Sequence, residues 1–322
     1  MNNHALEGKL DRKKITIVGA GNIGATLALL LARRETADIT LIDINEGVAK
    51  GKALDIMEAS PILGFNAHVV GTGNYEDTAN SDIVIITAGF PRKPGMSRDD
   101  LLFKNFEVVK SVSEQIKRYS PEAFVIVVTN PLDAMTYTAL KVTGFPKERV
   151  MGMAGVLDSA RFAYFISEKT NISVENINAF VIGGHGDDMV PLRKYTTIAG
   201  MPITKFLTKE ELEEVIQRTR FGGGEIVQLL KTGSAFYAPA ASILEMVLAI
   251  IWNKRKILSA SVYLDGEVGE YYGASGLCVG VPIILGKEGV EEIIKLDLTE
   301  EEWADWRKSV ESVRRLVEKL PL

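Results

Sequence analysis

Through roughly its first 150 residues, this chain alternates between short apolar, β-branched runs and longer segments with helical periodicity. The predicted strands are Ile15–Val18, Ile39–Ile42, Ala67–Gly71, Ile83–Thr87 and Phe124–Thr129. The predicted helices between them are Ile23–Glu35, Gly47–Ile62, Leu102–Tyr119 and Ala134–Val142. Several of the strands are apolar at successive positions, as strands buried on both faces are. This repeated alternation predicts an α/β fold with a doubly wound parallel sheet and right-handed crossovers.

The second half of the chain loses this alternation, and its pattern becomes mixed. Its strongest predicted elements are helices over Glu210–Leu230 and Ala240–Trp252, hairpin-like segments over Lys256–Leu285, and a charged helix over Glu300–Leu320. Such a mixture predicts an α+β lobe. We therefore divide the chain into a polar N-terminal extension over residues 1–13, a sheet-forming domain over 14–150 and a second domain over 151–322. No low-complexity linker separates the two domains, so we expect them to pack tightly.

Composition limits the classes of function. The chain has 322 residues, 46% of them hydrophobic and 25% charged, with a net charge of −5 and no basic stripe, so nucleic acid is not an expected partner. Its single cysteine, Cys278, excludes an internal disulfide and a multi-cysteine metal site. The segment Met1–Lys14 lacks the apolar core of a signal peptide, and the most apolar long run, Tyr237–Trp252, contains Glu245. We expect a cytoplasmic protein with no membrane partner.

The first predicted strand runs directly into a glycine-rich turn that opens the first predicted helix. The turn has the spacing GxGxxG and consists of Gly19, Ala20, Gly21, Asn22, Ile23 and Gly24. In this context the glycines allow a tight turn and close approach to a pyrophosphate, and the helix N-terminus offers free N–H groups. Asp43, at the end of the second strand, can accept hydrogen bonds from both ribose hydroxyls and would repel a 2′-phosphate. The sequence therefore predicts a Rossmann-type domain that binds NAD rather than NADP, with a merely structural turn as the alternative.

A loop rich in proline, glycine and cations follows the strand that ends near Thr87. It runs from Phe90 to Leu101 and carries Arg92, Lys93 and Arg98. Because ligands of doubly wound sheets bind at the carboxyl ends of the strands, this loop is a candidate lid that brings arginines to an anionic substrate. An ordinary charged surface loop is the alternative.

One of the three histidines in the chain, His185, lies between glycines after a strand-like run over Asn178–Ile182. Flanking glycines allow a ligand to approach closely, and imidazole exchanges protons near pH 7. His185 is therefore a candidate general acid or base. A structural turn histidine is the alternative, and it would be favoured if the motif stood alone.

Two further motifs supply candidate site residues. Asp158 and Arg161 are three residues apart in a helical pattern and so share a face. An arginine binds a carboxylate through two parallel bonds, and an aspartate can bond the second ring nitrogen of a histidine. Asn130 follows a predicted strand and lies at the same edge of the sheet. A helix-surface ion pair and a capping asparagine are the alternatives.

Five of these motifs occur in the order found in lactate/malate dehydrogenases, and the chain resembles that family over nearly its whole length. They are the glycine turn with Asp43, the loop Phe90–Leu101, Val128-Thr129-Asn130-Pro131, Leu157-Asp158-Ser159-Ala160-Arg161-Phe162 and Gly184-His185-Gly186-Asp187. The chain is most similar to the lactate-dehydrogenase-like malate dehydrogenases of bacteria and archaea. This resemblance implies an NAD-dependent oxidoreductase that requires no metal, acts on a small 2-hydroxy acid and forms a homodimer or homotetramer.

The resemblance also implies a role for each candidate residue. His185 would accept and donate the proton, Asp158 would orient it, and Arg98 would polarise the C2 carbonyl. Arg161 would bind the C1 carboxylate, and Asn130 would contact substrate and cofactor, with a cis peptide bond after it. The rest of the NAD site would be lined by the glycine turn, Asp43, Asn105, Val128 and Thr129.

The substrate is predicted by one position of the loop. Lactate enzymes generally have glutamine there and malate enzymes arginine, and this chain has Arg92. The second carboxylate of oxaloacetate needs a cation once the loop excludes water, whereas the methyl of pyruvate would leave Arg92 buried without a partner. The resemblance therefore implies oxidation of (S)-malate, with an L-lactate or broader 2-hydroxy-acid dehydrogenase as the alternative. Ala235, where many lactate enzymes have threonine, leaves room for related 2-oxo acids.

Other classes of function are less favoured by the residues present. NAD-dependent glycosidases have a related fold and hold a metal with cysteine and histidine, but Cys278 is remote in sequence from His185. A non-catalytic binding protein would be expected to lose part of the set of site residues. Allosteric lactate dehydrogenases often carry an arginine and a histidine for a sugar bisphosphate where this chain has Ala163 and Asn178, so we expect no such regulation.

We expect Arg92→Gln to shift substrate preference from oxaloacetate toward pyruvate, because glutamine cannot neutralise the second carboxylate. An unpaired buried charge costs several kcal/mol, so the ratio of the two kcat/KM values should change on the order of 10³-fold. Steady-state oxidation of NADH with each acid measures this ratio. An unchanged ratio would contradict the specificity role of Arg92.

Overall fold

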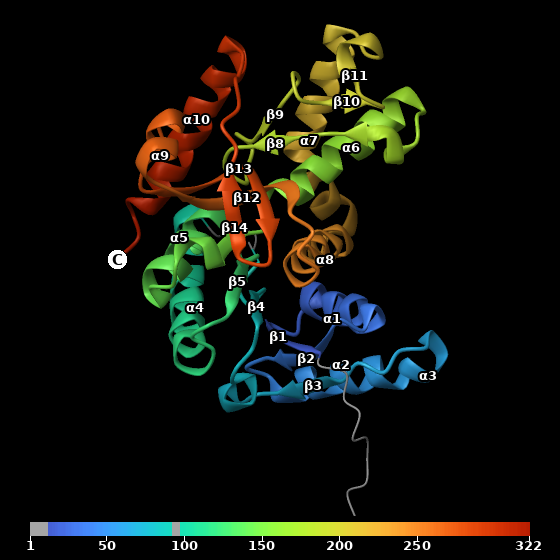
Figure 1. Ribbon diagram of the computed structural model, residues 1–322, viewed down its shortest axis with the longest axis vertical. Coiled ribbons are helices and arrows are strands. Elements are labelled where there is room, and N and C mark those ends of the chain that lie inside the picture. The colour runs from blue at the N-terminus through green and yellow to red at the C-terminus, as the bar shows by residue number, and fades with distance from the viewer. Residues whose placement is uncertain (1–11, 92–96) are drawn as a thin grey trace, which may run out of the picture.

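The computed structural model describes residues 12–91 and 97–322, and a large twisted sheet lies at its centre (Figure 1). In the described residues this sheet has nine strands, in the order β14-β13-β12-β6-β5-β4-β1-β2-β3. Six of them are parallel: β1 (Lys13–Val18), β2 (Ala37–Ile42), β3 (Val69–Thr72), β4 (Ile83–Ile86), β5 (Phe124–Val127) and β6 (Val150–Gly152). The other three are antiparallel: β12 (Lys256–Leu264), β13 (Leu277–Gly286) and β14 (Gly289–Ile293).

Helices cover both faces of this sheet. In Figure 1, α4 and α5 lie on one side, and α1 and α8 lie on the other. The helices are α1 (Asn22–Arg34), α2 (Glu46–Glu58), α3 (Ser60–Leu63), α4 (Arg98–Tyr119), α5 (Leu132–Thr143), α6 (Gly155–Thr170), α7 (Lys209–Leu230), α8 (Tyr237–Ile251), α9 (Gly266–Tyr272) and α10 (Glu300–Val317). Two small sheets are formed by β7 (Ile177–Asn178), β8 (Val181–Ile182), β9 (Val190–Pro191), β10 (Thr197–Ile198) and β11 (Met201–Pro202). No helix in the described ranges is long and apolar enough to cross a membrane.

The predicted fold class is confirmed, and the reason is visible in the strands. Ile15 and Ile17 of β1 pack into the apolar cluster that also contains residues of α1 and α8. Val18 packs into the opposite cluster, together with Phe106 and Val109 of α4. Side chains of a strand alternate between its two faces, so an uninterrupted apolar run requires cover on both sides.

The three long strands of the second half, β12, β13 and β14, do not form a sheet of their own. β12 pairs with β6 through Ser261 and Gly152, and so the three antiparallel strands extend the parallel sheet. The hairpin-like pattern over residues 256–285 is confirmed as two adjacent antiparallel strands, with α9 inserted between them. Sequence periodicity predicted these strands, but it contains no information about which edge they join.

Several element boundaries differ from the prediction. The predicted loop Phe90–Leu101 ends early, because Ser97 caps α4 through a reciprocal capping box with Asp100 and the helix begins at Arg98. The predicted helix Gly47–Ile62 is divided into α2 and α3, with Pro61 in the first turn of α3. The run Asn178–Ile182 is divided between β7 and β8, which belong to different small sheets.

We expect Gly71→Ala to destabilise the protein, because β3 lies directly against α2 at this point. A Cβ atom on Gly71 would lie 2.2 Å from the carbonyl oxygen of Ala49, and overpacking of this kind typically costs about 1–3 kcal/mol. Gly51→Ala in α2 is the matched control: a Cβ there meets nothing within 4 Å, and alanine should stabilise the helix by about 0.5–1 kcal/mol. Denaturant unfolding measures both effects, and a Gly71→Ala protein as stable as the original would contradict this packing.

Candidate active site

The carboxyl ends of five parallel strands form one row. The register pairs Val18 with both Ile42 and Ile86, pairs Ile86 with Val127, and pairs Val127 with Gly152. The chain therefore leaves the sheet at the same edge after each of these residues. The glycine turn, Asp43, Thr87, the segment from Val128 to Asn130 and the start of α6 all follow from this row.

The glycine turn has two kinds of glycine. Gly19 has a φ of 109°, and a Cβ there would lie 2.7 Å from the hydroxyl of Thr87; a Cβ on Gly24 would lie 2.0 Å from the carbonyl oxygen of Gly19. These two positions require glycine for the turn and for helix packing. Gly21 has no neighbour within 4 Å of a Cβ, and no side chain caps α1 there, so the first N–H groups of the helix are left for an external acceptor such as a phosphate.

Asp43 lies directly after β2, one residue beyond the predicted strand end, and is bonded to the glycine turn. Its Oδ2 accepts the N–H of Ala20 at 2.8 Å, and its Oδ1 accepts the N–H of Asn45 at 2.9 Å. Burial, together with the charge of Asp43, raises the pKa of Tyr75 to about 12. The donors and acceptors around the turn therefore fit a dinucleotide: backbone N–H groups suit phosphate oxygens, and a fixed carboxylate suits ribose hydroxyls and opposes a 2′-phosphate.

Asn105 connects the predicted loop with the end of β5. Its Oδ1 accepts the N–H of Phe90 at 2.7 Å, and its Nδ2 donates to the carbonyl oxygens of Phe90 and Asn130 at 3.1 and 2.6 Å. Asn105 is buried, and Asn130 is exposed and followed by a cis peptide bond to Pro131, as the resemblance implied. The side chains of Val128 and Thr129, which precede Asn130, are buried. The roles of Asn105, Val128, Thr129 and Asn130 in NAD binding stay predictions.

His185 and Asp158 form a buried hydrogen-bonded pair. The imidazole Nδ1 lies 2.8 Å from Oδ2 of Asp158, and the side chains are 15% and 3% exposed. α6 carries Asp158, and the turn after β8 carries His185. Burial by itself lowers the pKa of His185, but the charge and hydrogen bond of Asp158 outweigh it, and the pKa is raised above its ordinary value. The carboxylate of Asp158 therefore favours the imidazolium form of His185.

Arg161 completes this group from the next turn of α6. Its Nη1 lies 3.4 Å from Oδ1 of Asp158, and its Nε is buried without a partner in the described part of the chain. Burial lowers the pKa of Arg161 and Asp158 opposes this effect, and the guanidinium remains charged. α7 leaves space beside it, because a Cβ on Gly223 would lie 3.6 Å from Nη1. A buried cation with unused donors is suited to bind a carboxylate.

The side chains of three predicted site residues lie outside the part of the chain that the structure describes. Arg92 and Lys93 lie outside the described residues, and so does the side chain of Arg98, whose backbone begins α4. Ala235 lies half-buried in the segment between α7 and α8. The roles of Arg92 and Arg98 stay predictions.

The residues that hold the turn of His185 were not predicted from the sequence. The carboxylate of Asp133 in α5 accepts the backbone N–H of His185 at 2.7 Å, and the hydroxyl of Ser309 in α10 accepts the N–H of Gly184 at 2.9 Å. Gly183 and Gly280 exchange two backbone bonds at 2.8 and 3.1 Å. An acidic residue within the apolar start of a helix, three residues after Asn130, was a signal for Asp133. Nothing local in the sequence pointed to Ser309.

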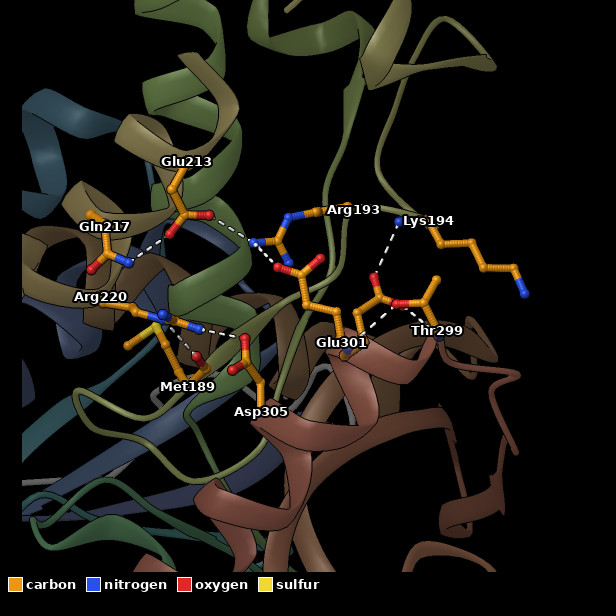
Figure 2. A network of polar contacts seen from close by, with 10 residues as sticks. Met189, Arg193, Lys194, Glu213, Gln217, Arg220, Thr299, Glu301 and Asp305 are labelled. Atoms are coloured by element: carbon orange, nitrogen blue, oxygen red, sulfur yellow. Dashed lines mark hydrogen bonds and ion pairs between the residues drawn. The ribbon is translucent and has the colours of Figure 1, made fainter. Parts of the chain in front are cut away.

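A polar network connects the segment after His185 with α7 and α10 (Figure 2). Arg220 of α7 donates to the carbonyl oxygen of Met189 at 3.1 Å and pairs with Asp305 of α10 at 2.9 Å. Arg193 pairs with Glu213 of α7 at 2.7 Å. The segment that follows His185 is therefore tied to both helices.

Two protein-family models match nearly the whole chain. Residues 13–152 match the family model for the lactate/malate dehydrogenase NAD binding domain, and residues 155–320 match the model for the lactate/malate dehydrogenase alpha/beta C-terminal domain. The chain belongs to the lactate/malate dehydrogenase family. Within the described residues there is no group of three or more histidine, cysteine, aspartate or glutamate side chains that could hold a metal ion.

Both malate dehydrogenases and lactate dehydrogenases of this family are similar to the chain. The malate dehydrogenase of Bacillus israeli is 56% identical over 97% of this chain and 99% of its own length. The crystal structure of Cryptosporidium parvum malate dehydrogenase has a TM-score of 0.92 at 47% identity, covering 96% of this chain and 99% of that one. The Cryptosporidium parvum lactate dehydrogenase, solved with lactic acid and β-nicotinamide adenine dinucleotide, also has a TM-score of 0.92, at 40% identity over 97% and 100% of the two chains. The fold alone does not separate the two activities.

The raised pKa of His185 sets an expected pH dependence. Reduction of a 2-oxo acid needs the imidazolium, so its rate should fall as the pH rises through the pKa of His185, which is raised above its ordinary value. Asp158→Asn removes the charge that supports the imidazolium, and this alkaline limb should move to lower pH. The pH profile of kcat/KM for NADH-dependent reduction measures the shift. Asp188→Asn is the control, since Asp188 pairs with Lys308 and Ser312, and an unmoved limb in Asp158→Asn would contradict the assignment.

Proposed function

We propose that this chain catalyses the reversible NAD-dependent oxidation of (S)-malate to oxaloacetate. The observation that carries the proposal is the buried group of His185, Asp158 and Arg161 beside the carboxyl ends of the strands, which joins a proton-transfer pair to a carboxylate-binding cation. Arg92 in the sequence supports a dicarboxylic acid. The malate dehydrogenases with more than half of their residues in common support the same substrate.

The glycine turn with Asp43 and the N-terminus of α1 would hold the cofactor. Bound NAD⁺ supplies an acceptor for the hydride that leaves C2 of the substrate. The backbone N–H groups at Gly21 and the following residues would bind the pyrophosphate, and Asp43 would bind the adenosine ribose and disfavour NADP.

In the oxidation, neutral His185 accepts the hydroxyl proton while C2 loses its hydrogen as hydride, and the C–O single bond becomes a carbonyl. Nε2 receives the proton, because Nδ1 is bonded to Asp158. The resulting imidazolium is stabilised by the carboxylate, and it returns the proton in the reverse reaction. Proton transfer by a positioned group of this kind contributes about 10²–10⁴-fold to the rate.

Arginines orient the substrate in this proposal. Arg161 would bind the C1 carboxylate with its buried fork, and Arg92 would bind the second carboxylate. Arg98 would polarise the C2 oxygen, and Asn130 would donate to it. Electrostatic interactions are stronger where water is excluded. In this proposal the contacts of the arginines with the substrate would therefore strengthen when the predicted loop Phe90–Leu101 covers the site.

An L-lactate or broader 2-hydroxy-acid dehydrogenase is the second candidate. It is favoured by the equal TM-score of the lactate dehydrogenase structure and by the small, half-buried Ala235. We also infer a homodimer or homotetramer. Exposed apolar side chains on and beside α2 and α3 support this inference: Ile44, Leu54 and Ile62.

The direct test is steady-state oxidation of NADH with oxaloacetate, with pyruvate and with no acid, repeated with NADPH. We expect oxaloacetate with NADH to give the highest kcat/KM. Higher activity with pyruvate would favour the second candidate, and no turnover with either acid would contradict both.

His185→Asn should reduce kcat by about 10²–10⁴-fold, because asparagine cannot exchange the proton. The dissociation constant for NADH should be unchanged, since the glycine turn is intact. Fluorescence titration with NADH measures binding separately from turnover. A variant with its kcat retained would remove His185 from the mechanism.

A further inference from the structure

Asp133 is a buried carboxylate that the mechanism above leaves unused. It is the second residue of α5, is 5% exposed and lies three residues after Asn130. Its Oδ2 accepts the backbone N–H of His185 at 2.7 Å, and its Oδ1 accepts the hydroxyl of Ser261 in β12 at 2.7 Å. One carboxylate therefore connects α5, β12 and the turn that carries His185.

The contact to His185 is made with its backbone, which decides where the imidazole can reach. A residue between two glycines has little local restraint of its own, so the anchors around the turn hold it in place. Asp133 is the only anchor in the described residues that bonds His185 itself and not its glycine neighbours, apart from the ring contact with Asp158. A displacement of about 1 Å at a reacting group can cost ~10²-fold in rate.

The charge of Asp133 also acts on the imidazole. Burial raises the pKa of Asp133, while the hydrogen bonds from Ser261 and from the backbone of His185 oppose this effect. Its place in the first turn of α5 favours the anion as well. The anion raises the pKa of His185 in the same direction as Asp158, against burial and Arg161.

Other titratable groups near this pair do not replace it. Burial and the charge of Asp133 raise the pKa of Cys278 in β13, so its thiol stays neutral. Asp188, on the turn of His185, is paired with Lys308 of α10 at 2.7 Å. The charged groups that complete the surroundings are Asp187 on the same turn, Arg161 of α6, and Lys141 of α5 beside Cys278.

We propose that Asp133 is a positioning residue of the proton-transfer site. Its carboxylate holds the backbone of His185 at the ends of the strands, and its negative charge supports the imidazolium. The kinetic consequences rest on the proposed function, but the effect on the titration of His185 does not.

The first test is an NMR titration of the histidines in protein without substrate or NAD. The chain has three histidines, and His185→Asn identifies the signal of His185. Asp133→Asn keeps an oxygen that can accept the N–H of His185 but removes the charge, so the pKa of His185 should fall. An unmoved pKa would overturn the electrostatic part of the proposal. Since no turnover is needed, this result is separate from the fate of the proposed reaction.

The second test separates positioning from charge by kinetics. Asp133→Ala removes the acceptor, and kcat with oxaloacetate and NADH should fall by about 10²-fold at every pH with an unchanged KM for NADH. Asp133→Asn should recover most of kcat at low pH, where the imidazolium still forms, and should lose it at lower pH than the original protein. Wild-type kcat in Asp133→Ala, or equal loss in both variants at all pH values, would overturn the positioning role.

Two further variants keep the test decisive if Asp133→Ala fails to fold. Ser309→Ala removes the acceptor for Gly184 and should lower kcat without changing the pKa of His185. Thr138→Val is the control for damage to α5, because this buried hydroxyl bonds only the carbonyl oxygen of Ala134 among the contacts described. It should lower stability alone, and a shift of the pH profile in Thr138→Val would overturn the assignment of that shift to Asp133.

Discussion

The hydrogen-bonded register of the parallel strands holds Ile42, Val18, Ile86, Val127 and Gly152 in one row. Each strand then ends at the same edge, and five segments far apart in the sequence leave the sheet side by side. A slip of one residue in any strand would turn its apolar side chains to the opposite face, where the other cluster is already packed. The register is therefore held by burial on both faces, and it decides which polar residues can meet.

The turn of His185 depends on the sheet in a different way. It follows a two-residue strand, and its place is set by contacts with three distant elements, through Asp133, Ser309 and Gly280. Those elements are themselves fixed to the large sheet, because β12 joins β6 and the antiparallel strands continue the parallel ones. Breaking one of these buried polar contacts leaves a group without a partner, which costs about 1–3 kcal/mol. The hydrogen-bonded pair of His185 and Asp158 and the glycine turn are thus parts of one packed body.

Two carboxylates, Asp43 and Asp158, lie in different surroundings in this body. Asp43 is held by backbone N–H groups at the glycine turn, where we propose that its charge favours NAD over NADP. Asp158 lies deeper, between His185 and Arg161, and there the low polarity of the surroundings strengthens each interaction. Burial alone lowers the pKa of His185, but the charge and hydrogen bond of Asp158 outweigh it and raise the pKa above its ordinary value.

Local pattern was enough to determine the fold class and the glycine turn, because burial on both faces and a strand-to-helix turn each leave a periodic or spaced signature. It also placed Asp158 and Arg161 on one helix face, and they lie 3.4 Å apart. The capping box that starts α4 at Arg98 was readable in the sequence but was missed. Only the tertiary structure decided that β12 joins β6 and that Asp133 bonds His185, since these contacts join residues 109 and 52 positions apart and depend on how the elements pack. Local sequence patterns indicated which residue types suit the chemistry, and tertiary packing decided which of them are in contact.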